Sequence, residues 1–328
     1  MSASPCKICG STRRAVIRDT LRHGIKRNVL LCGRCGFVFL EPKKKGATGY
    51  YSGREYRKMY GPTLKKASTP KEIFDIYFPF QDRIIKEFKH VLRPGMNVLD
   101  VGCSTGHLLA ALKGKVKERV GVELNRDEAA FVRKTQGIKV YSEPIETVDI
   151  KEGPFDLITS ARVLEHVDDP LIFLRALGRH LKPGGFIYLD VPNLDDALLS
   201  IFAVEGYADR YFREPHLSYF SRTTLRRLLT KAGFAGTIKT VQRYNFENAM
   251  HWIDTGKPQP HFTIGNRVPE IAPAGGAHAK ARAELNSFIK HADLSYKRIL
   301  QKHGLGEALI FLGQPVRGRR SAGKRKSS

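Results

Sequence analysis

The feature that most constrains this chain is a glycine-containing turn that follows an apolar segment at residues 98–101. That segment reads Val-Leu-Asp-Val, which predicts a buried strand. Gly102 and Gly106 come next, and because neither has a Cβ the chain can turn tightly and a ligand can approach the backbone. A helix predicted after Gly106 would direct its unpaired N–H groups at that ligand. The turn therefore predicts an α/β fold with a binding site at the end of its first parallel strand.

An acidic residue supports this interpretation. Glu123 ends the next predicted strand, about 20 residues past the turn, where nucleotide-binding folds place the carboxylate that holds the ribose hydroxyls. A site for NAD is disfavoured, because the dinucleotide pattern requires glycine where Ser104 stands.

The segments that follow make the interpretation more specific. A short strand is predicted at 138–141, a strand with Asp156 at 154–160, a Leu-Glu-His run at 164–166, and a Lys-Pro-Gly-Gly turn into a strand at 182–192. Taken in this order, residues 95–245 resemble a class I S-adenosylmethionine-dependent methyltransferase. The resemblance implies an α/β fold with a Rossmann-like seven-stranded sheet and an antiparallel last strand. It also implies cofactor contacts from nine residues: Asp100, Gly102, Cys103, Gly106, Glu123, Leu124, Glu143, Pro144 and Ser160.

Four cysteines form a second pattern near the N-terminus. Cys6 and Cys9 form one CxxC pair and Cys32 and Cys35 another, separated by 22 residues in which two alternating apolar segments predict a hairpin. This spacing brings four thiolates to one tetrahedral zinc ion. With four protein ligands the zinc would have no open position, so it is expected to be structural.

The alternative for these cysteines is a pair of disulfides. The sequence shows no apolar N-terminal segment typical of a signal peptide and no run long enough to span a membrane. We therefore expect a cytoplasmic protein with no membrane partner, in a reducing compartment where thiols bind metal.

The excess positive charge is concentrated at the two ends of the chain. The formal net charge is +24, to which residues 1–66 contribute sixteen Lys and Arg against three acids, and residues 317–328 six basic residues and no acid. A basic end can be a solvated tail or an arm for a polyanion such as nucleic acid. Because no aromatic residue interrupts the C-terminal run, a solvated tail is favoured there.

Turn and cap signals divide the chain into parts. Thr69-Pro-Lys-Glu72 predicts the capped start of a helix over 70–92, and a strand is expected over 236–244. About sixty residues before the last strand form an insertion, with a loop at 256–276 and a helix at about 277–303, which we expect to cap the substrate pocket. The predicted parts are a zinc-binding module at 1–66, a core at 67–245, a helical insertion at 246–304, a closing strand at 305–314 and a disordered basic tail at 315–328.

Two histidines are the candidate catalytic bases. His166 and His216 follow the fourth and fifth predicted strands, at the ligand edge of such a sheet. The zinc-binding start, the Leu-Glu-His run and His-Leu-Ser-Tyr-Phe at 216–220 together resemble a subgroup of bacterial methyltransferases that act on sugars and natural products. The resemblance implies that His216 is the general base, assisted by His166 and Tyr77. Each histidine could instead be a buried packing residue.

Three functions stay open at this stage. The first is methyl transfer to a small molecule such as a sugar, a polysaccharide precursor or a natural-product intermediate. The second is methylation of RNA held by the basic ends, although the sequence has no Asn-Pro-Pro-Tyr-type motif and no catalytic cysteine pair. The third is a binding protein without catalysis. The acceptor atom and the oligomeric state are not determined by the sequence.

Overall fold

The structure is a computed structural model that describes residues 5–42, 69–261, 263–272 and 275–316. Residues 317–328 of the predicted basic tail, and residues 1–4 and 43–66 of the predicted N-terminal module, lie outside the described residues.

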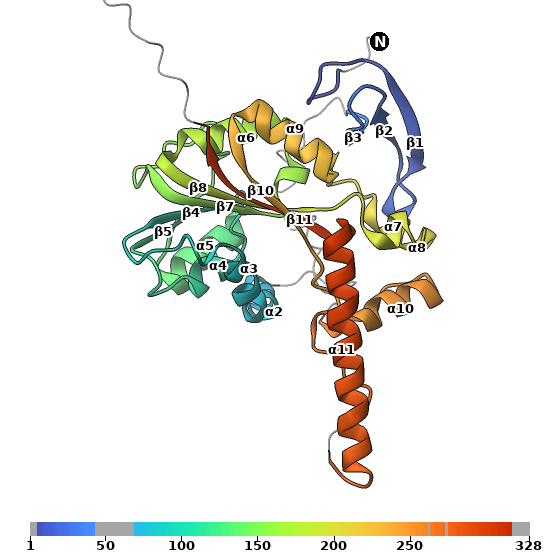
Figure 1. The fold of residues 1–328 in the computed structure, drawn as a ribbon. Helices are drawn as coiled ribbons and strands as arrows, with labels where there is room; N and C mark the ends of the chain where they lie inside the picture. The colour runs from blue at the N-terminus through green and yellow to red at the C-terminus, as the bar shows by residue number, and fades with distance from the viewer. Residues whose placement is uncertain (1–4, 43–68, 262, 273–274, 317–328) are drawn as a thin grey trace, which may run out of the picture.

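A seven-stranded mixed sheet forms the centre of the molecule (Figure 1). Its strand order is β10-β11-β8-β7-β4-β5-β6, and β11 runs antiparallel to both of its neighbours while the pairs among β4 to β8 are parallel. This confirms the predicted Rossmann-like sheet with an inverted last strand. The strands are β4 (Asn97–Val101), β5 (Glu118–Val122), β6 (Lys139–Tyr141), β7 (Phe155–Ala161), β8 (Leu181–Pro192), β10 (Phe234–Val241) and β11 (Ala308–Pro315).

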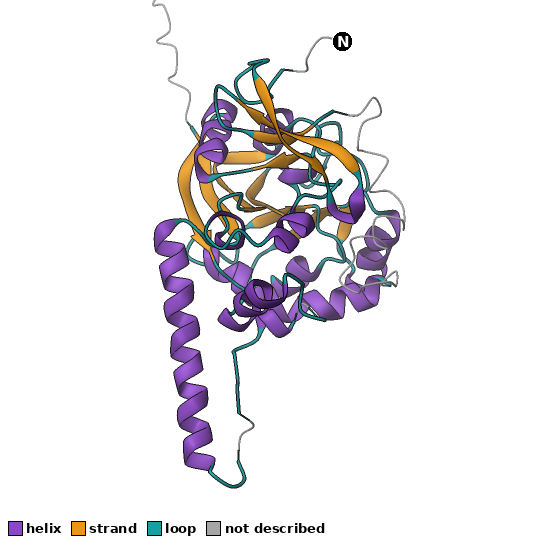
Figure 2. Ribbon diagram, turned by 90° about the vertical axis from the view of Figure 1, so that its right-hand side faces the viewer, coloured by secondary structure: helices purple, strands orange, loops and turns teal. Residues whose placement is uncertain are grey.

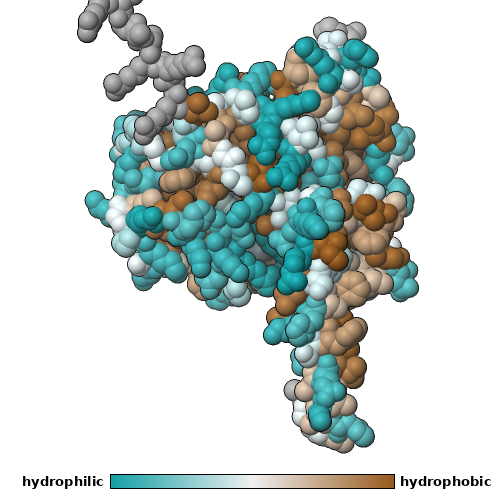
Figure 3. Space-filling view, in the orientation of Figure 1, coloured by the Kyte–Doolittle hydropathy of each residue, from teal (hydrophilic) through white to brown (hydrophobic). Residues whose placement is uncertain are grey.

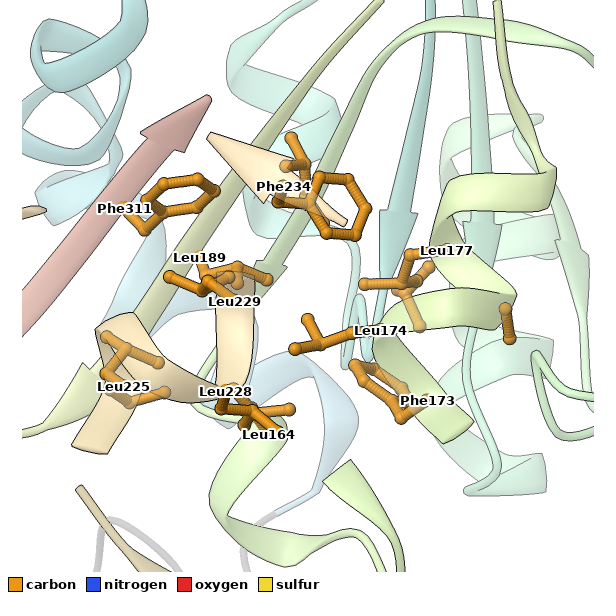
Figure 4. Packing of buried hydrophobic residues seen from close by; sticks show 14 of the residues in the cluster. Leu164, Phe173, Leu174, Leu177, Leu189, Leu225, Leu228, Leu229, Phe234 and Phe311 are labelled. Carbon is orange, nitrogen blue, oxygen red and sulfur yellow. The ribbon is translucent and has the colours of Figure 1, made fainter. Parts of the chain in front are cut away.

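Helices cover both faces of the sheet (Figure 1). On one face lie α2 (Pro70–Tyr77), α3 (Gln81–Phe88), α4 (His107–Ala111) and α5 (Arg126–Gln136), and on the other lie α6 (Pro170–Arg179) and α9 (Arg222–Ala232). The helices α6 and α9 pack their apolar faces together over the sheet (Figure 4). Burial of these apolar side chains is the main stabilising contribution of this layer.

The helix expected over residues 70–92 is interrupted. Thr69 and Glu72 form the predicted capping box, but α2 ends at Tyr77, a 3₁₀ turn covers Phe78–Phe80, and α3 runs only to Phe88. Pro79 explains the break, because proline has no N–H to donate and its ring disfavours helical geometry at the residue before it.

The N-terminal segment forms a second, smaller sheet. Its strands are β1 (Arg14–Thr20), β2 (Lys26–Cys32) and β3 (Val38–Leu40), so the predicted hairpin is confirmed, with a 3₁₀ turn at Arg22–Gly24 between its strands. A fourth strand, β9 (Ser218–Tyr219), comes from the middle of the chain and pairs with β3. The N-terminal segment is thus joined to the core by a shared sheet.

The insertion before β11 contains two helices, α10 (Phe246–Thr255) and α11 (Ala279–His303), with a 3₁₀ turn at Ile264–Asn266 between them. The predicted helix corresponds to α11. One half of this long helix projects away from the body of the molecule, with only a loop beside it (Figures 1 and 2). None of the described helices is both long and apolar enough to cross a membrane.

Candidate active site

A cavity of about 940 Å³ lies at the carboxyl ends of β4, β5, β7 and β8. Two short helices, α7 (Ala197–Ser200) and α8 (Glu205–Tyr211), part of the insertion, and residues of α2, α3 and α6 also contribute to its wall. Ligands of open α/β sheets bind at this edge, because the strand ends and the following turns meet there. The position of the cavity therefore agrees with the site predicted from the glycine turn.

Glu123 organises the glycine turn. One carboxylate oxygen accepts a hydrogen bond from the Ser104 N–H and the other from the Asn125 N–H, both at 2.8 Å. The Ser104 hydroxyl in turn donates to Glu128 at 2.7 Å. These bonds hold the ends of β4 and β5 side by side, with Glu123 on the cavity wall, where a ribose is expected.

Backbone conformation and close packing within the protein require glycine at both positions of the turn. Gly102 and Gly106 have φ values of +79° and +72°, a region that favours glycine. A Cβ on Gly102 would lie 2.3 Å from a methyl carbon of Val163, and one on Gly106 would lie 2.9 Å from Val132. Close packing of the turn against Val163, in the segment after β7, and against α5 explains both glycines, in addition to the ligand approach inferred from the sequence.

The nine residues implied as cofactor contacts divide into two groups. Gly102, Glu123, Leu124 and Pro144 line the cavity. Asp100, Cys103, Gly106, Glu143 and Ser160 are not among the described residues that line it. Their contact with the cofactor stays a prediction. The wall also contains three residues that the sequence analysis did not select: Ser104, Asn125 and Ile145. Asn125 and Ile145 are close to Glu123 and Pro144 in the sequence, which is a signal that could have identified them.

Asp100 and Cys103 lie beneath the turn. Cys103 is 1% exposed and packs with Leu109 and Val132, so its side chain belongs to the core, not to the cavity wall. Burial raises the pKa of Asp100 to about 7, and the Thr159 hydroxyl donates to its carboxylate at 2.7 Å. Both side chains therefore support the turn from below.

The two predicted histidines are brought together. The rings of His166 and His216 lie edge to face, with their centroids 4.8 Å apart, and both line the cavity. His166 Nδ1 is 2.9 Å from the Pro215 carbonyl oxygen, which can only accept, so Nδ1 carries the proton and Nε2 carries the lone pair. His166 therefore has the tautomer that a general base needs at Nε2.

His216 is in a different state. Its Nε2 accepts hydrogen bonds from Arg213, from Nε at 2.8 Å and from Nη2 at 2.6 Å. Burial and then the positive charge of Arg213 hold the pKa of His216 well below its usual range. The ring is therefore neutral, with its remaining proton on Nδ1.

The third predicted catalytic residue, Tyr77, also lines the cavity. Its ring packs at a tilt of 35° against His107, at the start of α4, with the centroids 5.6 Å apart. Tyr77 is thus placed beside the glycine turn.

Backbone hydrogen bonds fix the segment that carries His216. The Leu217 N–H donates to the Glu165 carbonyl oxygen at 2.8 Å, and the Leu40 N–H donates to the Leu217 carbonyl at 3.0 Å. Strand β9 then pairs Ser218 with Phe39. The histidine segment therefore lies between the Leu-Glu-His turn at Leu164–His166 and the N-terminal sheet.

A buried ion network closes another side of the cavity. Asp190 pairs with Arg162, at 3.0 Å, and with Arg243. Glu307 pairs with Arg243 at 3.1 Å. The sequence analysis missed this network, because its members are far apart in the chain and belong to no local motif.

Glu165 and the two histidines form a cluster that could be mistaken for a metal site, since one potential ligand atom from each lies within 4.8 Å of the others. Their protonation opposes that interpretation. Nδ1 of His216 carries a proton because Arg213 donates to Nε2, and a metal ion would also lie next to the positive charges of Arg162 and Arg213. Burial raises the pKa of Glu165 to about 7.

With this geometry established, comparisons with known proteins identify the family. Residues 75–237 match a family described as a methyltransferase domain. A relative that is 35% identical over 118 residues, the ubiquinone biosynthesis O-methyltransferase of Pseudomonas paraeruginosa, aligns with 34% of this chain and 50% of its own length. The chain belongs to the class I S-adenosylmethionine-dependent methyltransferases.

Other similar proteins align with different shares of this chain. The ubiquinone biosynthesis O-methyltransferase of Thiobacillus denitrificans is 29% identical over 161 residues, covering 46% of this chain and 69% of the relative. A methyltransferase structure from Archaeoglobus fulgidus has 18% identity and a TM-score of 0.44, covering 73% of this chain and 98% of that one. The sugar N-methyltransferase KedS8 from Streptoalloteichus has 26% identity and a TM-score of 0.30, covering 36% and 48%. The chain spans about half the length of the first curated relatives it matches.

The four N-terminal cysteines of this methyltransferase converge as predicted. Cys6 Sγ is 3.6 Å from Cys35 Sγ, Cys9 Sγ is 3.5 Å from Cys32 Sγ, and all four sulfurs lie within 4.8 Å of one another. None of the four is in a disulfide. Sulfurs bound to one tetrahedral zinc at about 2.3 Å would be roughly 3.8 Å apart, so the donor set fits the ion.

Proposed function

We propose that this methyltransferase transfers the methyl group of S-adenosylmethionine to a hydroxyl oxygen of a small molecule. One observation carries the proposal: a single cavity joins the glycine turn and Glu123 to the His166–His216 pair. The cofactor supplies an activated methyl group on a sulfonium, so the protein has to orient the acceptor and remove its proton.

Residues of the turn would hold the cofactor. Glu123 is placed to accept hydrogen bonds from the ribose hydroxyls, and Leu124 and Pro144 give the cavity an apolar wall suited to a purine ring. The backbone of Gly102 would lie against the methionine end.

His166 is the better candidate for the general base. Its Nε2 lone pair is fixed by the hydrogen bond from Nδ1 to the Pro215 carbonyl oxygen. On His216 the Nε2 lone pair already receives two N–H groups from Arg213, so that ring would position the acceptor and support His166. This exchanges the roles expected from the family resemblance, in which His216 was the base. Tyr77 would assist from the cofactor side.

The acceptor is proposed to be a small molecule because the site is a concave cavity lined by residues of α8, α10 and the turns of the sheet. The relatives named for ubiquinone biosynthesis are O-methyltransferases, which supports a hydroxyl acceptor. Sugars, polysaccharide precursors and natural-product intermediates all present such hydroxyls. The RNA hypothesis gains no support from the described residues, since the basic tail lies outside them.

We also propose that Cys6, Cys9, Cys32 and Cys35 bind one structural zinc ion. Burial raises the pKa of Cys6 and of Cys35, whereas at Cys32 burial is outweighed by hydrogen bonds, first those from the backbone of Arg34 and Cys35, which lower the pKa to about 7, so the four close thiols do not ionise together. A divalent cation removes this conflict, because it stabilises all four thiolates at once.

The test of the methyl-transfer proposal starts from labelled S-adenosylmethionine and a cell extract, with the small-molecule and RNA fractions counted separately. Label in the small-molecule fraction is expected. With the acceptor isolated, H166A should lower turnover by about 10²–10⁴ and leave cofactor affinity unchanged in calorimetry. If H216A abolishes turnover while H166A leaves it intact, His216 is the base. Label in the RNA fraction alone would refute the small-molecule acceptor, and label in neither fraction would favour a binding protein.

A further inference from the structure

Six of the arginines that the structure describes line the cavity, and most of them have partners that can be assigned. Arg162 and Arg243 are neutralised by Asp190 and Glu307 in the buried network. Arg83 donates to the side-chain oxygen of Asn266 at 3.2 Å, and Arg213 donates to His216. The arginines on the wall are Arg22, Arg83, Arg162, Arg210, Arg213 and Arg243.

Arg210 differs from the others. It lies on α8 and lines the cavity, yet it forms no hydrogen bond or ion pair with any residue that the structure describes. Burial is the main influence that lowers its pKa, and the charge of Arg213 adds to it. A guanidinium does not lose its proton in proteins, so the cavity contains a positive charge that is partly removed from water and has no counter-charge. Such a charge is costly until an anion binds it.

The surroundings of Arg210 are aromatic. Tyr207 lies one turn earlier on α8, and its ring packs edge to face on Trp252 of α10 with the centroids 5.1 Å apart. Its hydroxyl donates to Asp196 at 2.6 Å, so the carboxylate of Asp196, which also lines the cavity, is directed to the tyrosine. Tyr211 and Tyr244 also line this part of the wall. Arg210 therefore presents a planar, bidentate donor beside a flat apolar surface.

We propose that Arg210 binds an oxyanion, a carboxylate or a phosphate, on the molecule that occupies the acceptor half of this cavity. The inference rests on the proposed function in that this molecule is the methyl acceptor. The acceptor would then carry its anionic group at Arg210 and its reacting hydroxyl at the histidine pair. Arg213 connects the two positions, because it bonds to His216 and its charge acts on Arg210.

The fluorescence of Trp252 can report this binding, since Trp252 is the single tryptophan of the chain and lines the same cavity. The purified full-length protein is titrated with inorganic phosphate and, separately, with malonate, at constant ionic strength set with sodium chloride. A saturable change in tryptophan fluorescence is expected with at least one of the two anions, and the anion that saturates identifies the group that the site accepts.

R210Q tests the residue assignment. This variant should bind the saturating anion with an affinity about 10- to 100-fold lower, as expected for loss of a charge-assisted bidentate contact. R298Q, at an exposed position of α11, is the matched control and should bind the anion like the unmodified protein. The inference is overturned if neither anion saturates, if R210Q binds as tightly as the unmodified protein, or if R298Q weakens binding equally.

Calorimetry with S-adenosylmethionine separates this inference from the proposed function. R210Q should bind the cofactor as tightly as the unmodified protein, because Arg210 belongs to the acceptor half. Should the unmodified protein bind the anion but not the cofactor, methyl transfer would be refuted and the oxyanion site would stand. Cofactor binding without anion binding would refute the oxyanion site alone.

Discussion

The N-terminal module and the insertion before β11 are both additions to the methyltransferase core, yet they attach to it in opposite ways. Residues 5–42 of the module share a sheet with the core, and Phe37, which is fully buried, packs on Phe220 with ring centroids 5.6 Å apart. Phe288 of α11 is 68% exposed. Apolar surface extends along this projecting helix (Figure 3).

The difference shows how each addition contacts the candidate active site. The module contacts α9 through polar bonds as well, since Arg227 donates to the Cys35 carbonyl at 2.9 Å and Lys231 to that of Ile8 at 2.8 Å. Through β9 it also fixes the segment that carries His216. The insertion contributes Trp252 and Tyr296 to the cavity, whereas the first half of α11 lies outside it. The expected cap therefore covers the pocket only with its base.

The largest effect is expected from removal of the metal. C32S should abolish the proposed zinc site and unfold the N-terminal sheet, because a small sheet gains much of its folding free energy from the ion. Loss of the β3–β9 pairing would release the His216 segment, so turnover should fall on the order of 10²-fold or more. Metal analysis, circular dichroism and a turnover assay measure the three outcomes.

C103S is the control for this prediction, since Cys103 lies in the core beneath the glycine turn and should leave the zinc content unchanged. Zinc-free protein with full turnover would contradict the view that the module positions the catalytic segment.

A pair of identical substitutions tests the attachment of the two additions. F37A should lower the free energy of unfolding by about 3–5 kcal/mol, because it opens a cavity between the module and Phe220. F288A should change it by less than about 0.5 kcal/mol, because most of that side chain is already in water. Urea unfolding followed by circular dichroism gives both values, and similar losses in the two variants would contradict the comparison.

Local patterns selected four residues of the proposed cofactor contacts and all three candidate catalytic residues that line the cavity. The glycine turn, Glu123 and the four cysteines were found because the residues that act together lie within one motif or at a fixed spacing. Strand β9 has only two residues, too few for any periodicity, and its pairing with β3 exists only in the folded chain. The hydrogen bonds from Arg213 to His216 Nε2 also exist only in the folded chain. They are the reason for proposing His166, and not His216, as the general base. The interruption of the helix predicted over residues 70–92 is different, because a proline such as Pro79 is itself a local signal for the end of a helix.

A pH effect of intermediate size is expected from Glu165, whose backbone carbonyl anchors the His216 segment. Burial raises its pKa to about 7 from an ordinary value of 4.5, so between these pH values the folded state keeps a proton that the unfolded chain has lost. The free energy of unfolding should therefore fall as the pH rises through this window, by on the order of 3 kcal/mol from this group.

E165Q removes this contribution, so its stability should decline less than that of the unmodified protein between pH 5 and pH 8. Denaturant unfolding at several pH values measures the difference. E284Q, on the exposed half of α11, is the control. Parallel pH profiles for E165Q and the unmodified protein would show that Glu165 is already ionised in the folded state.

The smallest effect is expected at the outer end of the insertion. The side chain of Asn286 on α11 accepts hydrogen bonds from the N–H groups of Ile271 and Ala272, both at 3.0 Å, and donates to the Ala272 carbonyl at 2.7 Å. N286A should therefore release this loop from the helix and raise amide hydrogen exchange there. Because exposed sites of this kind open locally without global unfolding, the Tm and the turnover should stay unchanged. A drop in Tm as large as that of F37A would show that the projecting half of α11 folds as one unit with the core, and the contrast between the two additions would then fail.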